Sequence, residues 1–181
     1  MAHVCPWWGG YFIDNRLRRL LHDPEAILSP YVTPGMTVLD AGCGMGWFSI
    51  PMARMVGDQG RVIAADLQQQ MLDVLMKRAR KSGVDTRIQP HKCERDRLGV
   101  QIQADFILAF AMVHEVPDQR RLLGELRRCL KPSGRLLVAE PKIHVPGRAF
   151  RQTVGTAEDL GLRVVEQPRI RWCWAVVLGQ G

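Results

Sequence analysis

The sequence contains no long apolar run. Its longest clean stretch, Ile107–Val113, is far shorter than the roughly 20 residues that a membrane-spanning helix needs. The opening residues, MAHVCPWWGG, carry no basic segment followed by an apolar one, so they do not resemble a secretory signal. We therefore predict no membrane span and expect the protein in the cytoplasm.

Paired cysteine spacings are also missing. The five cysteines form no CxxC motif, and no histidines and cysteines cluster at zinc-finger distances. This pattern disfavours a disulfide scaffold and predicts no metal site, so the thiols are expected to be reduced. A length of 181 residues suits one domain with a sizeable core.

Acidic residues are outnumbered, with 18 Asp and Glu against 25 Lys and Arg, and the net charge is +7. The basic residues are spread over several expected helices, which favours solvated helix faces over one binding patch. A nucleic acid or another polyanion nevertheless stays open as a partner.

Apolar strands alternate with amphipathic helices along the chain, which predicts an α/β fold. The strands are continuously apolar, as in a parallel sheet covered on both faces. Pro90 cannot donate a hydrogen bond to a ladder, so its weaker strand is expected at an edge. The expected strands are 37–40, 61–66, 86–92, 104–110 and 134–140.

Two helices have clear apolar stripes, at 68–82 and at 119–130. Asp118 can cap the second helix, and the Lys-Pro-Ser-Gly segment at 131–134 is expected to end it. Residues 162–167 and 169–178 are expected to form an antiparallel hairpin that closes the sheet, with its turn at Pro168.

The predicted domain spans residues 1–181, with a helical cap or lid at 1–31 and an α/β core at 32–181. The cap is expected to contain short helices at 14–22 and 24–28. Four aromatic residues near its start could form part of an acceptor pocket or clasp the chain onto the sheet. They are Trp7, Trp8, Tyr11 and Phe12, and the first three are the candidates for the acceptor side.

The stretch VLDAGCGMGWF is the most informative one, because glycines follow the first strand at positions 42, 44 and 46. Glycine lets the backbone turn sharply and lets a ligand approach closely. Asp66 ends the second strand, where a carboxylate can accept hydrogen bonds from two ribose hydroxyls. Loop, acid and spacing together predict a ligand site.

The glycine spacing differs from the dinucleotide fingerprint G-x-G-x-x-G, which disfavours an NAD-dependent oxidoreductase. Asp40 adds a negative charge beside the loop, unfavourable for a pyrophosphate but suited to a cation. The site therefore favours an adenosine ligand with a positively charged end.

Four motifs then resemble class I S-adenosylmethionine-dependent methyltransferases, of the type 11 and quinone-biosynthesis-like group. They are VLDAGCGMGWFSIPMA, GRVIAADLQQQML, DFILAFAMVHEVPD and LKPSGRLLVAEPK, and the likeness covers about residues 32–178. The resemblance implies a doubly wound, mostly parallel seven-stranded sheet. It also implies S-adenosylmethionine as cofactor and S-adenosylhomocysteine as product.

The resemblance also implies roles for individual residues. The methionine end would lie along Asp40 and the glycine loop, the ribose on Asp66, and the adenine near Leu67 and the segment after the edge strand. The full implied cofactor set is Asp40, Gly42, Cys43, Gly44, Gly46, Asp66, Leu67, Cys93, Glu94, Ala109 and Phe110.

Methyl transfer needs a general base only if the acceptor carries a proton, and His114 is the candidate. Met112, Glu115 and His144 are candidates for the acceptor side. We expect the methyl acceptor to be a small molecule. The protein itself is expected to be a monomer or a homodimer.

Three other activities stay open. An RNA methyltransferase would suit the charge, although the Asn/Asp-Pro-Pro-Tyr motif of base N-methyltransferases is missing. A cofactor-binding module without catalysis is the second alternative. Transfer to a thiol or arsenite, suggested by Cys5, Cys93 and Cys173, is the third, but the thiols are scattered.

Overall fold

A seven-stranded sheet forms the centre of the computed structural model, which describes residues 22–181. Trp7, Trp8, Tyr11, Phe12 and nearly all of the helix expected at 14–22 lie outside the described residues. The spatial order is β3-β2-β1-β4-β5-β7-β6, and β7 runs antiparallel to both of its neighbours. The strands are β1 (Thr37–Ala41), β2 (Arg61–Asp66), β3 (Ile88–Lys92), β4 (Ala104–Phe110), β5 (Leu130–Pro141), β6 (Leu162–Glu166) and β7 (Cys173–Gln180).

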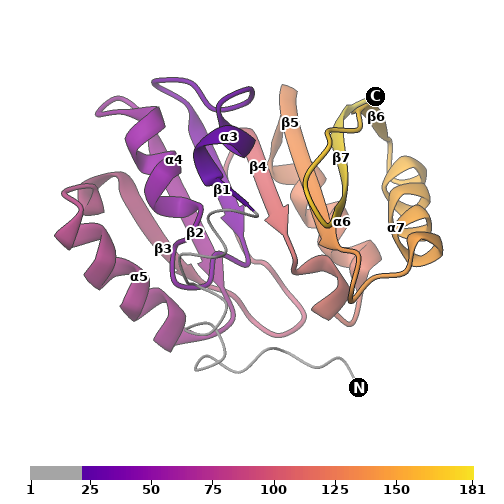
Figure 1. The fold of residues 1–181 in the computed structure, drawn as a ribbon, viewed down its shortest axis with the longest axis horizontal. Helices are drawn as coiled ribbons and strands as arrows, with labels where there is room; N and C mark the ends of the chain where they lie inside the picture. The colour runs from indigo at the N-terminus through magenta and orange to yellow at the C-terminus, as the bar shows by residue number, and fades with distance from the viewer. Residues whose placement is uncertain (1–21) are drawn as a thin grey trace.

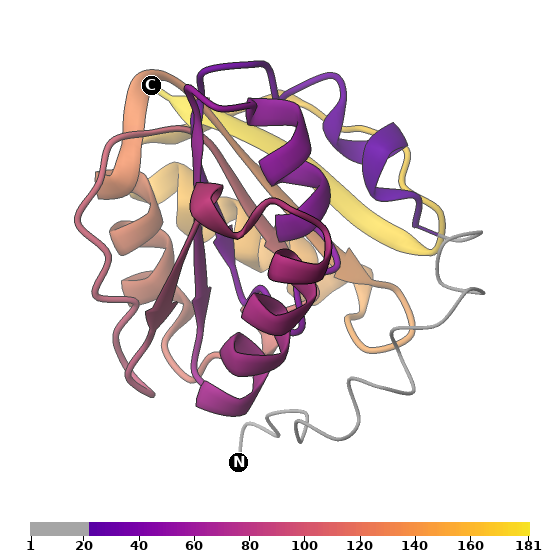
Figure 2. The same cartoon turned by 90° about the vertical axis from the view of Figure 1, so that its left-hand side faces the viewer.

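Helices cover both faces of the sheet, as Figures 1 and 2 show from two sides. Helices α3, α4 and α5 lie on one face, and α6 and α7 on the other. Their bounds are α3 (Pro24–Leu28), α4 (Ser49–Val56), α5 (Gln69–Lys81), α6 (Gln119–Cys129) and α7 (Gly147–Asp159), with 3-10 turns η1 (Asp85–Arg87) and η2 (Val113–Glu115). Within residues 22–181, no helix is long and apolar enough to cross a bilayer.

Strand β4 explains why the apolar runs are continuous. Phe106 and Leu108 belong to the core under α3–α5, whereas Ile107 and Ala109 belong to the core under α6 and α7. Successive side chains of a strand point to opposite faces, so a strand between two helical layers must be apolar at every position. The predicted doubly wound fold, with the Pro90 strand β3 at an edge, is confirmed.

Two boundaries differ from the sequence prediction. Helix α6 is capped by the Asp118 side chain as expected, but residues 131–134 belong to β5 rather than to a turn. The register of β5 against β4 shifts between Ala104 and Phe106. This irregularity accommodates Pro132 and Gly134 within the strand. Residues 169–172 were expected in a strand but lie in the connection between β6 and β7.

Phe106 is fully buried at the centre of the sheet and stacks on Tyr31. We expect Phe106→Ala to lower the free energy of unfolding by roughly 3–5 kcal/mol, because it removes buried apolar surface and leaves a cavity. Chemical denaturation measures this change. Val165→Ala, at a side chain that is 47% exposed, is the control and should stay within about 0.5 kcal/mol of wild type.

Candidate functional site

A cavity opens at the carboxyl edge of the sheet, between β1 and β4, where the strand order reverses. Ligands of doubly wound folds bind at this position. Eleven of the residues named from sequence line it: Asp40, Gly42, Cys43, Gly44, Asp66, Leu67, Cys93, Glu94, Phe110, Met112 and Glu115. Sequence reasoning did not name several others, including Met45, Trp47, Met71, Leu98 and Leu122.

The loop between β1 and α4 requires glycine at two positions for different reasons. Gly42 has φ +74°, and a Cβ there would lie 2.8 Å from the Met112 Cβ. Gly46 has φ +87°, and a Cβ there would lie 3.0 Å from Leu75 Cγ on α5. Gly42 therefore lets the loop approach the turn after β4, and Gly46 lets it pack on a helix.

Asp40 lies at the end of β1 and is only 2% exposed. Its Oδ2 accepts a hydrogen bond of 2.6 Å from the Ser49 hydroxyl in the first turn of α4. The carboxylate also lines the cavity. The hydrogen bond holds this carboxylate in one orientation, from which it can pair with a cationic ligand group.

Asp66 holds the glycine loop from the neighbouring strand. Its Oδ2 accepts from the Gly44 amide at 2.9 Å, and its Oδ1 accepts from the Gln68 amide at 2.8 Å. Burial raises the pKa of Asp66, while the backbone hydrogen bonds act in the opposite direction. Each carboxylate oxygen can accept more than one hydrogen bond, so both can still accept from ligand hydroxyls.

The two cysteines of the cavity are poor nucleophiles. Burial raises the pKa of the Cys43 thiol well above its usual range, and it raises the pKa of Cys93 to about 12. The thiolate is the form that attacks or binds a soft acceptor. In residues 22–181, no group of three or more His, Cys, Asp or Glu side chains could hold a metal ion.

Among residues 22–181, four of the predicted site residues do not line the cavity. Ala109 is fully buried under α6 and α7, and Gly46 packs against α5. His114 and His144 lie beside the cavity instead, with their rings stacked at 6.0 Å between centroids. His114 stands between Met112 and Glu115, both of which line the cavity.

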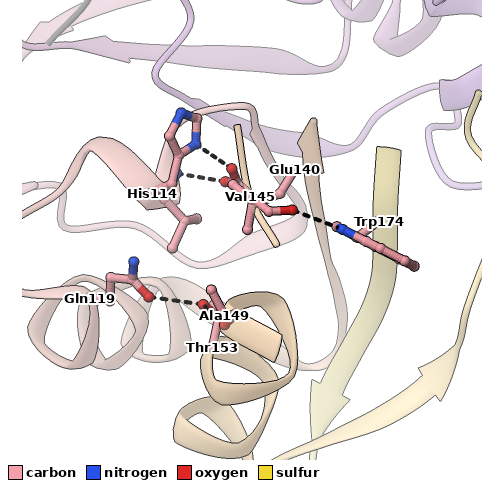
Figure 3. Close-up of polar contacts among 8 residues, drawn as sticks. His114, Gln119, Glu140, Val145, Ala149, Thr153 and Trp174 are labelled. Carbon is pink, nitrogen blue, oxygen red and sulfur yellow. Dashed lines mark hydrogen bonds and ion pairs between the residues drawn. The ribbon is translucent and has the colours of Figure 1, made fainter. Parts of the chain in front are cut away.

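Glu140, which sequence reasoning missed, organises this neighbourhood (Figure 3). It ends the buried part of β5 and is 2% exposed. Its Oε1 accepts from the Val113 amide at 2.8 Å, and its Oε2 is paired with His114 Nδ1. The sequence contains one signal for Glu140, because it is an acid near the carboxyl end of a strand, as Asp40 and Asp66 are.

Comparisons with known proteins agree with this geometry. A methyltransferase-domain profile matches residues 38–134, which is more than half of the chain. The chain belongs to the methyltransferase-domain family. The resemblance to class I S-adenosylmethionine-dependent methyltransferases is thereby confirmed, and with it the expected cofactor class.

Two curated relatives and one solved structure show which methyltransferases this domain is similar to. The ubiquinone/menaquinone biosynthesis C-methyltransferase UbiE of Vibrio campbellii is 36% identical over 108 residues, 59% of this chain and 42% of that protein. The demethylmenaquinone methyltransferase of Lactobacillus johnsonii is 34% identical over 110 residues, 60% of this chain and 45% of that protein. The chain thus spans less than half the length of these relatives. A SAM-dependent methyltransferase from Aquifex aeolicus superposes with a TM-score of 0.85 at 26% identity, covering 97% of this chain and 98% of that one.

The pairing with Glu140 makes the His114 titration testable. The hydrogen bond that His114 Nδ1 donates to the Glu140 carboxylate is the main reason that the pKa of His114 lies above its ordinary value of 6.5. Glu140→Gln keeps an oxygen for the Val113 amide but loses the charge, so the pKa of His114 should fall. A titration of the imidazole signals by NMR measures both values.

The raised pKa of His114 also determines how the stability of the protein changes with pH. A charged His114 stabilises the fold fully below pH 6.5, and this contribution is lost as the pH rises through the raised pKa. Glu140→Gln should therefore destabilise the protein more in acid than at alkaline pH. A native His114 that titrates at or below its ordinary pKa would contradict the assignment.

Proposed function

We propose that this protein transfers the methyl group of S-adenosylmethionine to a small-molecule acceptor. The observation that carries the proposal is a pair of carboxylates beside the glycine loop in the cavity, the buried Asp40 and the half-buried Asp66. One charge suits the cationic end of the ligand and the other suits its ribose hydroxyls. The charge of Asp40 beside the loop is unfavourable for a pyrophosphate.

Each part of the cofactor has a counterpart in the cavity. Asp40 would hold the methionine ammonium, and Asp66 would accept hydrogen bonds from the ribose hydroxyls. Leu67, Met71 and Leu98, at the β2 and β3 side of the cavity, would supply apolar surface for the adenine. Bound S-adenosylmethionine supplies an activated methyl group, so the protein has to position the acceptor in line and exclude water.

We further propose that the acceptor is a hydroxylated aromatic compound of the quinol type. The names of the curated relatives, a quinone-biosynthesis C-methyltransferase and a demethylmenaquinone methyltransferase, support this class. Methylation of a ring carbon releases a proton, which needs an acceptor group. His114, held at its Nδ1 by Glu140, is positioned to receive that proton beside the cavity.

Calorimetric titration tests the cofactor directly. S-adenosylmethionine and S-adenosylhomocysteine should both bind with affinities on the order of micromolar, whereas NAD should give no heat. Binding of NAD alone would overturn the assignment of Asp40 and of the loop spacing.

Asp66→Ala should weaken binding of S-adenosylhomocysteine by roughly 2–4 kcal/mol, because it removes charged acceptors for two hydroxyls. The same titration measures the change. Asp73→Ala is the matched control, since Asp73 is an exposed acid on α5 whose side chain accepts a hydrogen bond from Gln69. Equal affinity for Asp66→Ala and Asp73→Ala would mean that the ribose lies elsewhere.

A further inference from the structure

Two large apolar side chains are exposed close together at the carboxyl edge of the sheet. Ile143, in the β5–α7 loop, is 88% exposed, and Trp172, in the β6–β7 loop, is 65% exposed. The Lys142 amide donates to the Trp172 carbonyl at 2.9 Å, so the two loops are joined beside these side chains. In residues 22–181 the one other exposed large apolar residue is Val165, on the edge strand β6.

The backbone holds Trp172 outward in a conformation that a bulky residue rarely adopts. Its φ is +60°, in the left-handed region. The Cys173 amide donates to the Ile170 carbonyl at 3.1 Å, which closes a turn with Trp172 at the position that normally favours glycine or asparagine. The left-handed backbone of Trp172 exposes the indole, so this side chain adds no burial to the core. The arrangement points to a role other than stabilising the fold.

Within the two loops that carry these side chains, the charged residues are all basic. The segments KIHVPG at 142–147 and QPRIRW at 167–172 contain Lys142, Arg169 and Arg171 but no acidic residue. All three basic residues are exposed. The protein as a whole carries a net charge of +7. An exposed indole and an aliphatic side chain flanked by cations match an anionic lipid interface.

The same corner connects to the cofactor cavity. His22 Nε2 is hydrogen-bonded to the Arg171 carbonyl at 2.8 Å, and its ring packs edge-on against Phe110 at 5.2 Å. Phe110 lines the cavity. On the β5 side, the loop that carries Ile143 begins after Pro141, the neighbour in sequence of Glu140, which is the partner of His114.

We propose that Ile143, Trp172 and the flanking basic residues dock this protein on an anionic phospholipid bilayer. Docking turns the side of the molecule next to the cavity toward the lipid. The next step rests on the proposed function. A cavity held beside the bilayer takes its methyl acceptor from the membrane, so the acceptor is a lipid-soluble molecule.

Co-sedimentation with vesicles tests the docking. The full chain should pellet with vesicles of equal parts phosphatidylcholine and phosphatidylglycerol, and much less with phosphatidylcholine alone. The double variant Ile143→Ser, Trp172→Ser should partition about tenfold more weakly. Val165→Ser, which removes an exposed apolar side chain from β6, is the matched control and should partition like wild type.

Charge is tested in the same way. Arg169→Gln with Arg171→Gln should weaken partitioning by roughly fivefold for each charge removed. Arg80→Gln with Lys81→Gln removes the same net charge from exposed positions on α5 and should have little effect, since distant charges are screened at physiological salt.

Three outcomes would overturn the proposal. Wild-type protein could stay in the supernatant with both kinds of vesicle, or the Ile143 and Trp172 double variant could pellet like wild type. Alternatively, the wild-type protein could fail to bind vesicles but bind duplex RNA in a way that depends on Arg169 and Arg171. The partner of this surface would then be a nucleic acid and not a bilayer. Calorimetry of the same variants with S-adenosylhomocysteine keeps this test separate, because cofactor binding and vesicle binding can each fail alone.

Discussion

Burial of the sheet on both faces is the constraint on which the rest of the structure depends. The central strands β1, β2 and β4, enclosed by α3–α5 on one side and by α6 and α7 on the other, have apolar side chains throughout their middle positions. In these strands the polar side chains therefore lie near the strand ends. The parallel strands all present their carboxyl ends at one edge, so the functional groups of distant segments meet there.

Three acids at this edge, the buried Asp40 and Glu140 and the half-buried Asp66, share a second property, because each one holds the segment beside it. Asp40 accepts from Ser49, Asp66 accepts from the amides of Gly44 and Gln68, and Glu140 accepts from the Val113 amide. The carboxylates thereby fix the loops that form the cavity before any ligand arrives. Such preorganisation reduces the entropic cost of positioning reactants.

The sequence predicted the fold well because two-sided burial produces continuous apolar runs, and because the glycine loop has a demanding backbone. The same runs limited the site prediction. In a strand that is apolar at every position, nothing in the sequence tells which residues face which layer. Ala109 and Phe110 were both expected at the cofactor, yet only Phe110 lines the cavity. Glu140 was missed because no glycine motif follows it, and its partners come from a segment far away in the sequence. The start of β7 depends on a turn at Trp172 that carries no typical turn residue.

The position of β7 has a consequence for the order of assembly. β7 follows β6 in the chain but lies between β5 and β6, and β6 pairs with no other strand. β6 therefore cannot join the sheet until β7 has been synthesised, and the two are expected to add as a preformed hairpin. Loss of residues 173–180 would consequently detach two strands rather than one.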